Sequence, residues 1–260
     1  MGKSKKSKVN KRPKQTGAGH VRPSKALGQN FLIDENVIDA IIEGSDVTED
    51  SLVIEIGPGE GALTTRLAER AGRVVAVELD ERLVKLLNVK LFGDENVEII
   101  HGDILEVDLN EIIRSRMDEY QLTNVRVVGN LPYYITTPII MKLLEMGTKA
   151  DSITVMMQKE VGDRLIAEPG TKASGAITYS VHYYSEVSKV VDAGSECFYP
   201  APKVDSVVLR MDLLDERPVE PADEDFYFRT IKAGFAQRRK TLQNKHTTHK
   251  GYDKTKKEQQ

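Results

Sequence analysis

The sequence contains a single cysteine, Cys197, among its 260 residues. One thiol cannot form an internal disulfide or a cysteine metal cluster, so a reducing compartment is expected. The five histidines are scattered without zinc-type spacing. No segment approaches the ~18 consecutive apolar residues of a membrane helix, and the basic N-terminus lacks the apolar stretch of a secretory signal. We therefore expect a cytoplasmic protein with no metal and no membrane partner.

Charge is distributed unevenly along the chain, although the formal net charge is only −3. Residues 1–30 contain nine Lys/Arg and no acid, and residues 238–260 contain eight Lys/Arg against two acids. The segment between them carries 20 basic and 38 acidic residues. Basic ends of this kind are either solvated, disordered tails or arms that neutralise the phosphates of a nucleic acid, and composition leaves both interpretations open.

Apolar runs alternate with helical spacings through the middle of the chain. Strands are predicted at 52–56, 74–77, 97–100, 125–128 and 153–157. Helices are predicted between them and before the first, around 37–42, 63–68, 81–91, 109–118 and 138–146, with Asp34 as the cap of the first helix. This alternation predicts an α/β fold with a mostly parallel sheet and helices on both faces.

Polar or flexible residues follow four of the predicted strands: Gly57, Glu78, Asp103 and Asn130. Parallel strands end at the same edge of a sheet, so one crevice is expected to collect these residues. The glycine loop reads G-x-G-x-G (Gly57, Gly59, Gly61), whereas dinucleotide sites have G-x-G-x-x-G. Glu78 is placed to bind ribose hydroxyls and Asp103 an adenine amino group. The alternative is that these two acids cap helices.

Residues 127–134 read VVGNLPYY, a β-branched run that stops at an amide, a proline and two aromatic residues. The Asn130 side-chain oxygen and the Leu131 carbonyl, held before Pro132, offer two acceptors for the two N–H bonds of an adenine amine. Tyr133 offers a face on which a base can stack. The segment therefore predicts a pocket for an adenine amine, with an ordinary Asn-x-Pro turn at a strand end as the alternative.

These features together resemble the S-adenosylmethionine-dependent methyltransferases that modify N6 of adenine in RNA. Longer motifs are similar to those of the KsgA/Dim1 family of small-subunit ribosomal RNA adenine dimethyltransferases: LGQNFL at 27–32, QKEV at 158–161 with Arg164, FYPAPKVDS at 198–206 and QRRKTL at 237–242. The resemblance covers about residues 25–243.

The resemblance implies a Rossmann-like fold that uses S-adenosylmethionine to dimethylate two adjacent adenosines near the 3′ end of small-subunit rRNA. It implies these cofactor-binding residues: Asn30, Leu32, Gly57, Gly59, Gly61, Glu78, Asp103, Ile104 and Asn130. The catalytic segment would be Asn130, Leu131, Pro132 and Tyr133, and the RNA phosphates would be held by Lys203, Arg238, Arg239 and Lys240. The expected partner is the immature small ribosomal subunit, bound by a monomer.

Three segments are expected: a basic disordered arm at 1–24, a methyltransferase domain at 25–212 and a reduced helical segment with a basic tail at 213–260. Members of the family usually continue for several dozen residues beyond the QRRK segment, so we expect a shortened second domain. An assembly factor with weak or lost catalysis is one alternative. A large-subunit methyltransferase of the antibiotic-resistance type is another, although Leu131 favours the small-subunit branch. The glycine spacing opposes a nucleotide-dependent oxidoreductase.

Overall fold

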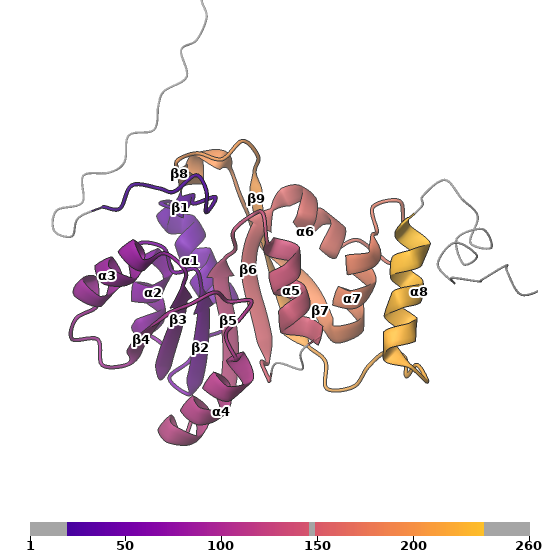
Figure 1. Cartoon of the computed structure of the whole chain (residues 1–260), viewed down its shortest axis with the longest axis horizontal. Coiled ribbons are helices and arrows are strands. Elements are labelled where there is room, and N and C mark those ends of the chain that lie inside the picture. Colours follow the sequence, from indigo (N-terminus) through magenta and orange to yellow (C-terminus); the bar gives the residue numbers. More distant parts are fainter. Residues whose placement is uncertain (1–19, 146–148, 237–260) are drawn as a thin grey trace, which may run out of the picture.

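The computed structural model describes residues 20–145 and 149–236, and a seven-stranded sheet forms its centre (Figure 1). Its strands, in chain order, are β2 (Ser51–Ile56), β3 (Arg73–Glu78), β4 (Val97–His101), β5 (Asn124–Asn130), β6 (Ser152–Gln158), β7 (Ser185–Ala193) and β9 (Ser206–Leu213). In space the order is β4-β3-β2-β5-β6-β9-β7. The first five strands are parallel, whereas β9 runs antiparallel to both β6 and β7.

Helices cover both faces of this sheet. They are α1 (Glu35–Gly44), α2 (Ala62–Ala68), α3 (Glu81–Lys90), α4 (Leu109–Tyr120), α5 (Thr136–Glu145), α6 (Lys159–Leu165), α7 (Ala176–Tyr184) and α8 (Glu224–Ala236). Successive side chains of a strand point to opposite faces. Leu52 and Ile54 of β2 accordingly join a core with α4, α5 and α7, while Val53 joins a second core with α1 and α2.

The predicted alternation is confirmed from the first helix to β6. Asp34 caps α1, because its Oδ1 accepts hydrogen bonds from the backbone N–H of Asn36 (3.0 Å) and Val37 (3.2 Å). The sheet is mostly parallel, as expected. The antiparallel strands β7 and β9 and the helices α6 and α7 were not predicted. Local periodicity does not reveal that β9 lies between β6 and β7, out of chain order.

Helix α8 lies within the segment expected to form a reduced helical unit. It packs on α7 through aromatic rings: the ring centroids of Tyr183 and Phe228 lie 5.1 Å apart with their planes at 90°. The arm at 1–19 and the tail at 237–260 lie outside the described residues, so the domain boundaries at 24 and 212 stay predictions. Within the described ranges, no helix is long and apolar enough to cross a membrane.

A short pair of antiparallel strands lies at the edge of the sheet where the parallel strands end. β1 (Phe31–Leu32) pairs with β8 (Phe198–Tyr199), joining segments far apart in the sequence, and both stand above the sheet in Figure 1. The chain from His20 to Leu32 therefore forms a strap over the glycine loop: a Cβ at Gly59 would lie 3.2 Å from Phe31.

Two helical glycines give a matched test of the packing. A Cβ at Gly162 in α6 would lie 2.2 Å from a methyl carbon of Val207, which is 1% exposed, so Gly162→Ala overpacks the interface of α6 with β9. We expect a loss of about 1–3 kcal/mol in the free energy of unfolding. At Gly234 in α8 no described atom other than the backbone of its own helix and its chain neighbours lies within 4 Å of such a Cβ.

Gly234→Ala should therefore stabilise the protein slightly, by about 0.5–1 kcal/mol, through helix propensity. Urea unfolding of both variants measures the difference. Equal effects at the two positions would contradict the packing of α6 against β9.

Candidate active site

A cavity of about 610 Å³ opens at the carboxyl edge of the parallel strands. This volume lies in the range of ~300–1,000 Å³ that ligand pockets occupy. The residues predicted for the cofactor and for the amine pocket all line it: Asn30, Leu32, Gly57, Gly59, Gly61, Glu78, Asp103, Ile104, Asn130, Leu131, Pro132 and Tyr133. The structure thus brings together segments that span about one hundred residues of sequence.

The glycine loop between β2 and α2 has a backbone that side chains rarely permit. Gly57, Gly59 and Gly61 have φ values of +66°, +60° and +80°. Glycine adopts this left-handed region at no steric cost. The loop therefore turns sharply beneath the strap and leaves its backbone accessible to a ligand.

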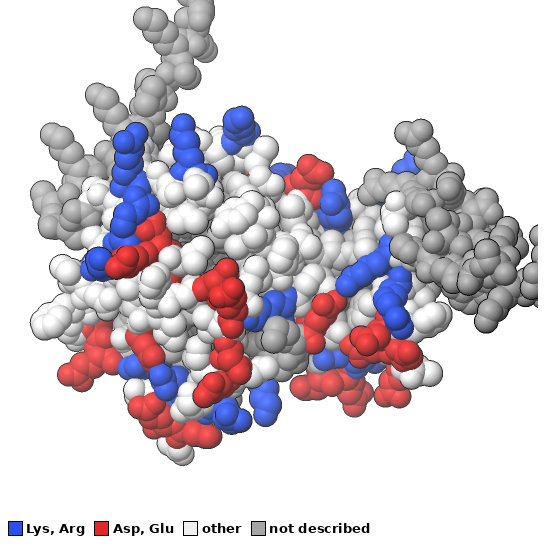
Figure 2. Space-filling model, in the orientation of Figure 1, with Lys and Arg blue, Asp and Glu red and all other residues white. Residues whose placement is uncertain are grey.

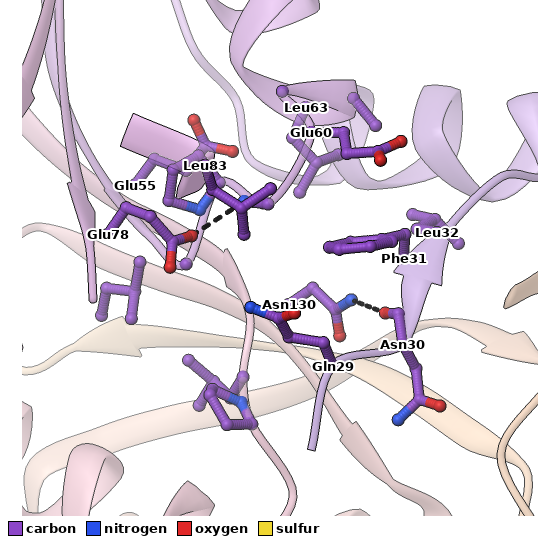
Figure 3. Close-up of a pocket in the computed structure, with 18 of the residues that line it drawn as sticks. Gln29, Asn30, Phe31, Leu32, Glu55, Glu60, Leu63, Glu78, Leu83 and Asn130 are labelled. Atoms are coloured by element: carbon purple, nitrogen blue, oxygen red, sulfur yellow. Dashed lines mark hydrogen bonds between the residues drawn. The ribbon is translucent and has the colours of Figure 1, made fainter. Parts of the chain in front are cut away.

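Glu78 ends β3 and turns towards this loop, as Figure 3 shows. Its Oε2 accepts a hydrogen bond from Gly59 N–H (3.2 Å) and its Oε1 from Asp80 N–H (2.9 Å). Burial raises the pKa of Glu78. Helix α3 is capped by Asp80 and helix α4 by Asp108, so neither Glu78 nor Asp103 caps a helix.

The strap is held to α3 through a buried carboxylate that the sequence analysis gave no role. Asp80 Oδ2 accepts from Gln29 Nε2 (2.9 Å) and from Arg82 (2.5 Å). The Arg82 guanidinium, together with Gln29, lowers the pKa of Asp80 to about 2. Gln29 in turn accepts at Oε1 from Ser24 N–H (2.7 Å). No local pattern signals the contact of Gln29 with Asp80, because 51 residues separate them.

Asn130 lies between the strap and the predicted amine pocket. Its Nδ2 donates to the backbone carbonyl of Asn30 (3.1 Å), the second hydrogen bond drawn in Figure 3. With the amide nitrogen engaged, the Asn130 Oδ1 is left as the acceptor. The next aromatic residue, Tyr133, is fixed at its hydroxyl, which lies 2.6 Å from Ser206 Oγ.

Glu55 is a second buried acid in the wall of the cavity, and the sequence analysis assigned it no role. It is 1% exposed, and its Oε2 has no hydrogen-bond partner among the described residues. Burial raises its pKa to about 8. The sequence feature that could have identified Glu55 is the presence of an acidic residue inside the otherwise apolar strand at 52–56.

The four expected RNA contacts lie apart from this cavity or beyond the described chain. Lys203 is exposed in the loop between β8 and β9 and does not line the cavity. Arg238, Arg239 and Lys240 lie outside the described residues.

The donor set of the cavity suits S-adenosylmethionine. Two buried acids, Glu55 and Glu78, lie in the wall of the cavity, and a cationic ligand bound there would stabilise their ionised forms. The left-handed glycine loop gives room for close approach. The mostly parallel sheet, its antiparallel strands β9 and β7 and this cavity fit a Rossmann-like methyltransferase that uses S-adenosylmethionine.

Comparisons with known proteins narrow this class. Residues 22–260 match the model of the family described as ribosomal RNA adenine dimethylase, and the chain belongs to that family. It is 48% identical over 221 residues to ribosomal RNA small subunit methyltransferase A of Alkaliphilus oremlandii, covering 85% of this chain and 76% of that protein. The same-named protein of Bacillus mycoides is 49% identical over 220 residues, covering 85% and 75%.

Solved structures agree with this assignment. A dimethyladenosine transferase from Plasmodium falciparum superposes with a TM-score of 0.70 at 26% identity, covering 83% of this chain and 74% of that one. The 23S rRNA methyltransferase ErmE gives 0.66 at 30% identity, covering 85% and 84%. The resemblance predicted from the motifs is thereby confirmed.

The raised pKa of Glu55 predicts how stability depends on pH. The unfolded carboxyl has a pKa near 4.5 and the folded one near 8, so the folded state keeps a proton that the unfolded state releases between these values. The stabilising effect is complete below about pH 4.5 and is lost as pH rises to about 8.

Between pH 5 and 8 the free energy of unfolding of the wild type should therefore fall more steeply than that of Glu55→Gln. The difference in slope should be about 1.4 kcal/mol per pH unit. Urea titrations at several pH values measure it, and parallel slopes would show that Glu55 is ionised in the fold.

Proposed function

We propose that this protein transfers methyl groups from S-adenosylmethionine to N6 of two adjacent adenosines near the 3′ end of small-subunit rRNA. The observation that carries the proposal is the position of Asn130, which lines the cofactor cavity and begins the Asn-Leu-Pro-Tyr segment. The names of the relatives, which describe small-subunit methyltransferases, support the choice of RNA.

The cofactor, when bound, supplies an electrophilic methyl group on a positively charged sulfur. Glu78 would hold the ribose, Asp103 the adenine ring, and Asn30 with Leu32 the methionine end. The glycine loop would pass along the ligand through its backbone. The wall formed by Phe31 and the other strap residues excludes water from one side of the cavity (Figure 3).

The remaining residues orient the base. The Asn130 Oδ1 and the Leu131 carbonyl accept the two N–H bonds of the amine, which directs its lone pair towards the methyl group. Tyr133 stacks on the ring. Positive charge develops on N6 as the methyl–sulfur bond breaks, and these oxygens stabilise it; N6 then loses a proton to solvent. Holding two reactants in this way can supply roughly 7–11 kcal/mol of the barrier.

The target adenosine has to be unpaired or extruded from a helix to enter such a pocket. Lys and Arg side chains stand along the upper edge in Figure 2, above the position of β1 and β8, while most acidic side chains lie lower. Arg22, Lys25 and Lys203 are exposed in the strap and in the loop after β8. This edge suits the RNA phosphates, and we propose that a monomer in the cytoplasm binds the immature small subunit there.

The proposal predicts that Asn130→Ala abolishes methylation while leaving the fold intact. Small subunits from cells that lack this activity are incubated with labelled S-adenosylmethionine, and methylated adenosines are identified by nuclease digestion and mass spectrometry. We expect N6,N6-dimethyladenosine with the wild type and a rate at least about 10²-fold lower with the variant. Asn88→Ala, on the exposed side of α3, is the matched control.

Bound but unmethylated subunits with the wild type would instead support an assembly factor without catalysis. Label in large subunits alone would support the large-subunit alternative, for which the likeness to ErmE is the relevant observation. Either result would overturn the proposed reaction.

Lys203→Ala should weaken binding of the small subunit without changing cofactor affinity. Losing one phosphate contact lowers the slope of log K against log salt by about one. Lys232→Ala, on α8 and paired with Glu145 (3.6 Å), removes the same charge elsewhere and should leave the slope unchanged. Filter binding at four salt concentrations distinguishes the two variants. Identical slopes for both would show that Lys203 does not contact the RNA.

A further inference from the structure

The phenolic oxygen of Tyr133 is tied to the interior of the sheet. It lies 2.6 Å from Ser206 Oγ, and Ser206 has no exposed surface. Ser206 begins β9, where it pairs with Gln158 of β6 on one side and Ala193 of β7 on the other. A hydroxyl between two paired strands has little freedom, so it is a rigid partner for a residue of the loop after β5.

This contact fixes the ring at two points. The backbone of Tyr133 follows Pro132 at the end of β5, and its far end is held by Ser206. Between these points the ring is half-buried and forms part of the cavity wall. A ring held at both ends cannot swing about its side-chain torsions, so the face it offers to a base has one orientation.

The hydroxyl is also poorly suited to proton transfer. Burial raises the pKa of Tyr133, so the phenol is neutral at physiological pH. Its hydrogen bond is with another neutral hydroxyl, whichever of the two donates. The oxygen therefore serves as an anchor.

We propose that Ser206 is a positioning residue, which holds Tyr133 in the orientation that stacks the target adenine for methyl transfer. This inference rests on the proposed function and assigns it a further residue. Ser206 acts through Tyr133 and does not touch the cofactor cavity. The loss of either hydroxyl should therefore affect the same step.

The test is a double-mutant cycle with Tyr133→Phe, Ser206→Ala and both together, measured by single-turnover methylation of small subunits. Each single variant should lower the rate about tenfold, because a loosened ring misplaces the base. The double variant should be no slower than the slower single one, whereas independent effects would multiply to about a hundredfold. The cofactor Kd should stay within about twofold of the wild type.

A matched control removes another buried hydroxyl from the same sheet. Ser185 at the start of β7 is 2% exposed, and its Oγ donates to the Val181 carbonyl (2.8 Å) outside the cavity. Ser185→Ala should keep the wild-type rate. If Ser206→Ala does not fold, Tyr133→Phe carries the test, because it removes only the phenolic oxygen.

Multiplicative losses in the double variant, or an unchanged rate with Tyr133→Phe, would overturn the role of Ser206. A changed pH profile of the rate in Tyr133→Phe would assign the hydroxyl to proton transfer and would overturn it too. Failure of the proposed function has a separate signature, because the wild type itself would then leave the small subunits unmethylated.

Discussion

The site depends on the close approach of two strands where both of them end. β2 and β5 are paired up to Ile56 and Gly129, and a Cβ at position 129 would lie 2.6 Å from the Ile56 carbonyl oxygen. Only glycine fits there without a shift of the backbone. The next residue on each strand is therefore fixed beside the other: Gly57 begins the glycine loop and Asn130 begins the proposed amine pocket. A substitution in this contact would separate the two halves of the reaction.

The electrostatics of the cavity follow from the same arrangement. Glu55 and Glu78 are buried at the ends of adjacent strands, and burial raises the pKa of both. Asp80 is also buried, yet its pKa is lowered, because Arg82 and Gln29 are its partners. At Glu55 and Glu78, in contrast, burial outweighs the hydrogen bonds and charges that favour the ionised carboxylate. A cationic ligand can offset this effect, since an opposite charge nearby stabilises a carboxylate that burial disfavours.

The sequence predicts those parts of this structure that are local. The strands from 52 to 157 are short segments rich in β-branched residues, and the cap at Asp34 is a single side chain acting on its own helix, so both follow from neighbouring residues. The four strand ends could be placed together because parallel strands share an edge. The strands β7 and β9 could not be predicted from local pattern. The contact of Tyr133 with Ser206 could not be predicted either, because the two residues are 73 positions apart and their contact depends on the register of β9. Motif resemblance identified the family, but it gave no role to Gln29, Glu55 or Ser206.

The proposed catalytic segment is held from two directions, and this has a consequence for specificity. Asn130 is oriented by the backbone of the strap, whereas Tyr133 is oriented by the sheet. The Asn30 carbonyl accepts a hydrogen bond from Nδ2 of Asn130, which leaves Oδ1 of that amide as the acceptor for a ligand. An acceptor there suits a base with an exocyclic amine and disfavours a carbonyl at the same position, since two acceptors would face each other. The preference for adenine thus depends on the backbone carbonyl of Asn30, which lies one hundred residues before Asn130 in the chain.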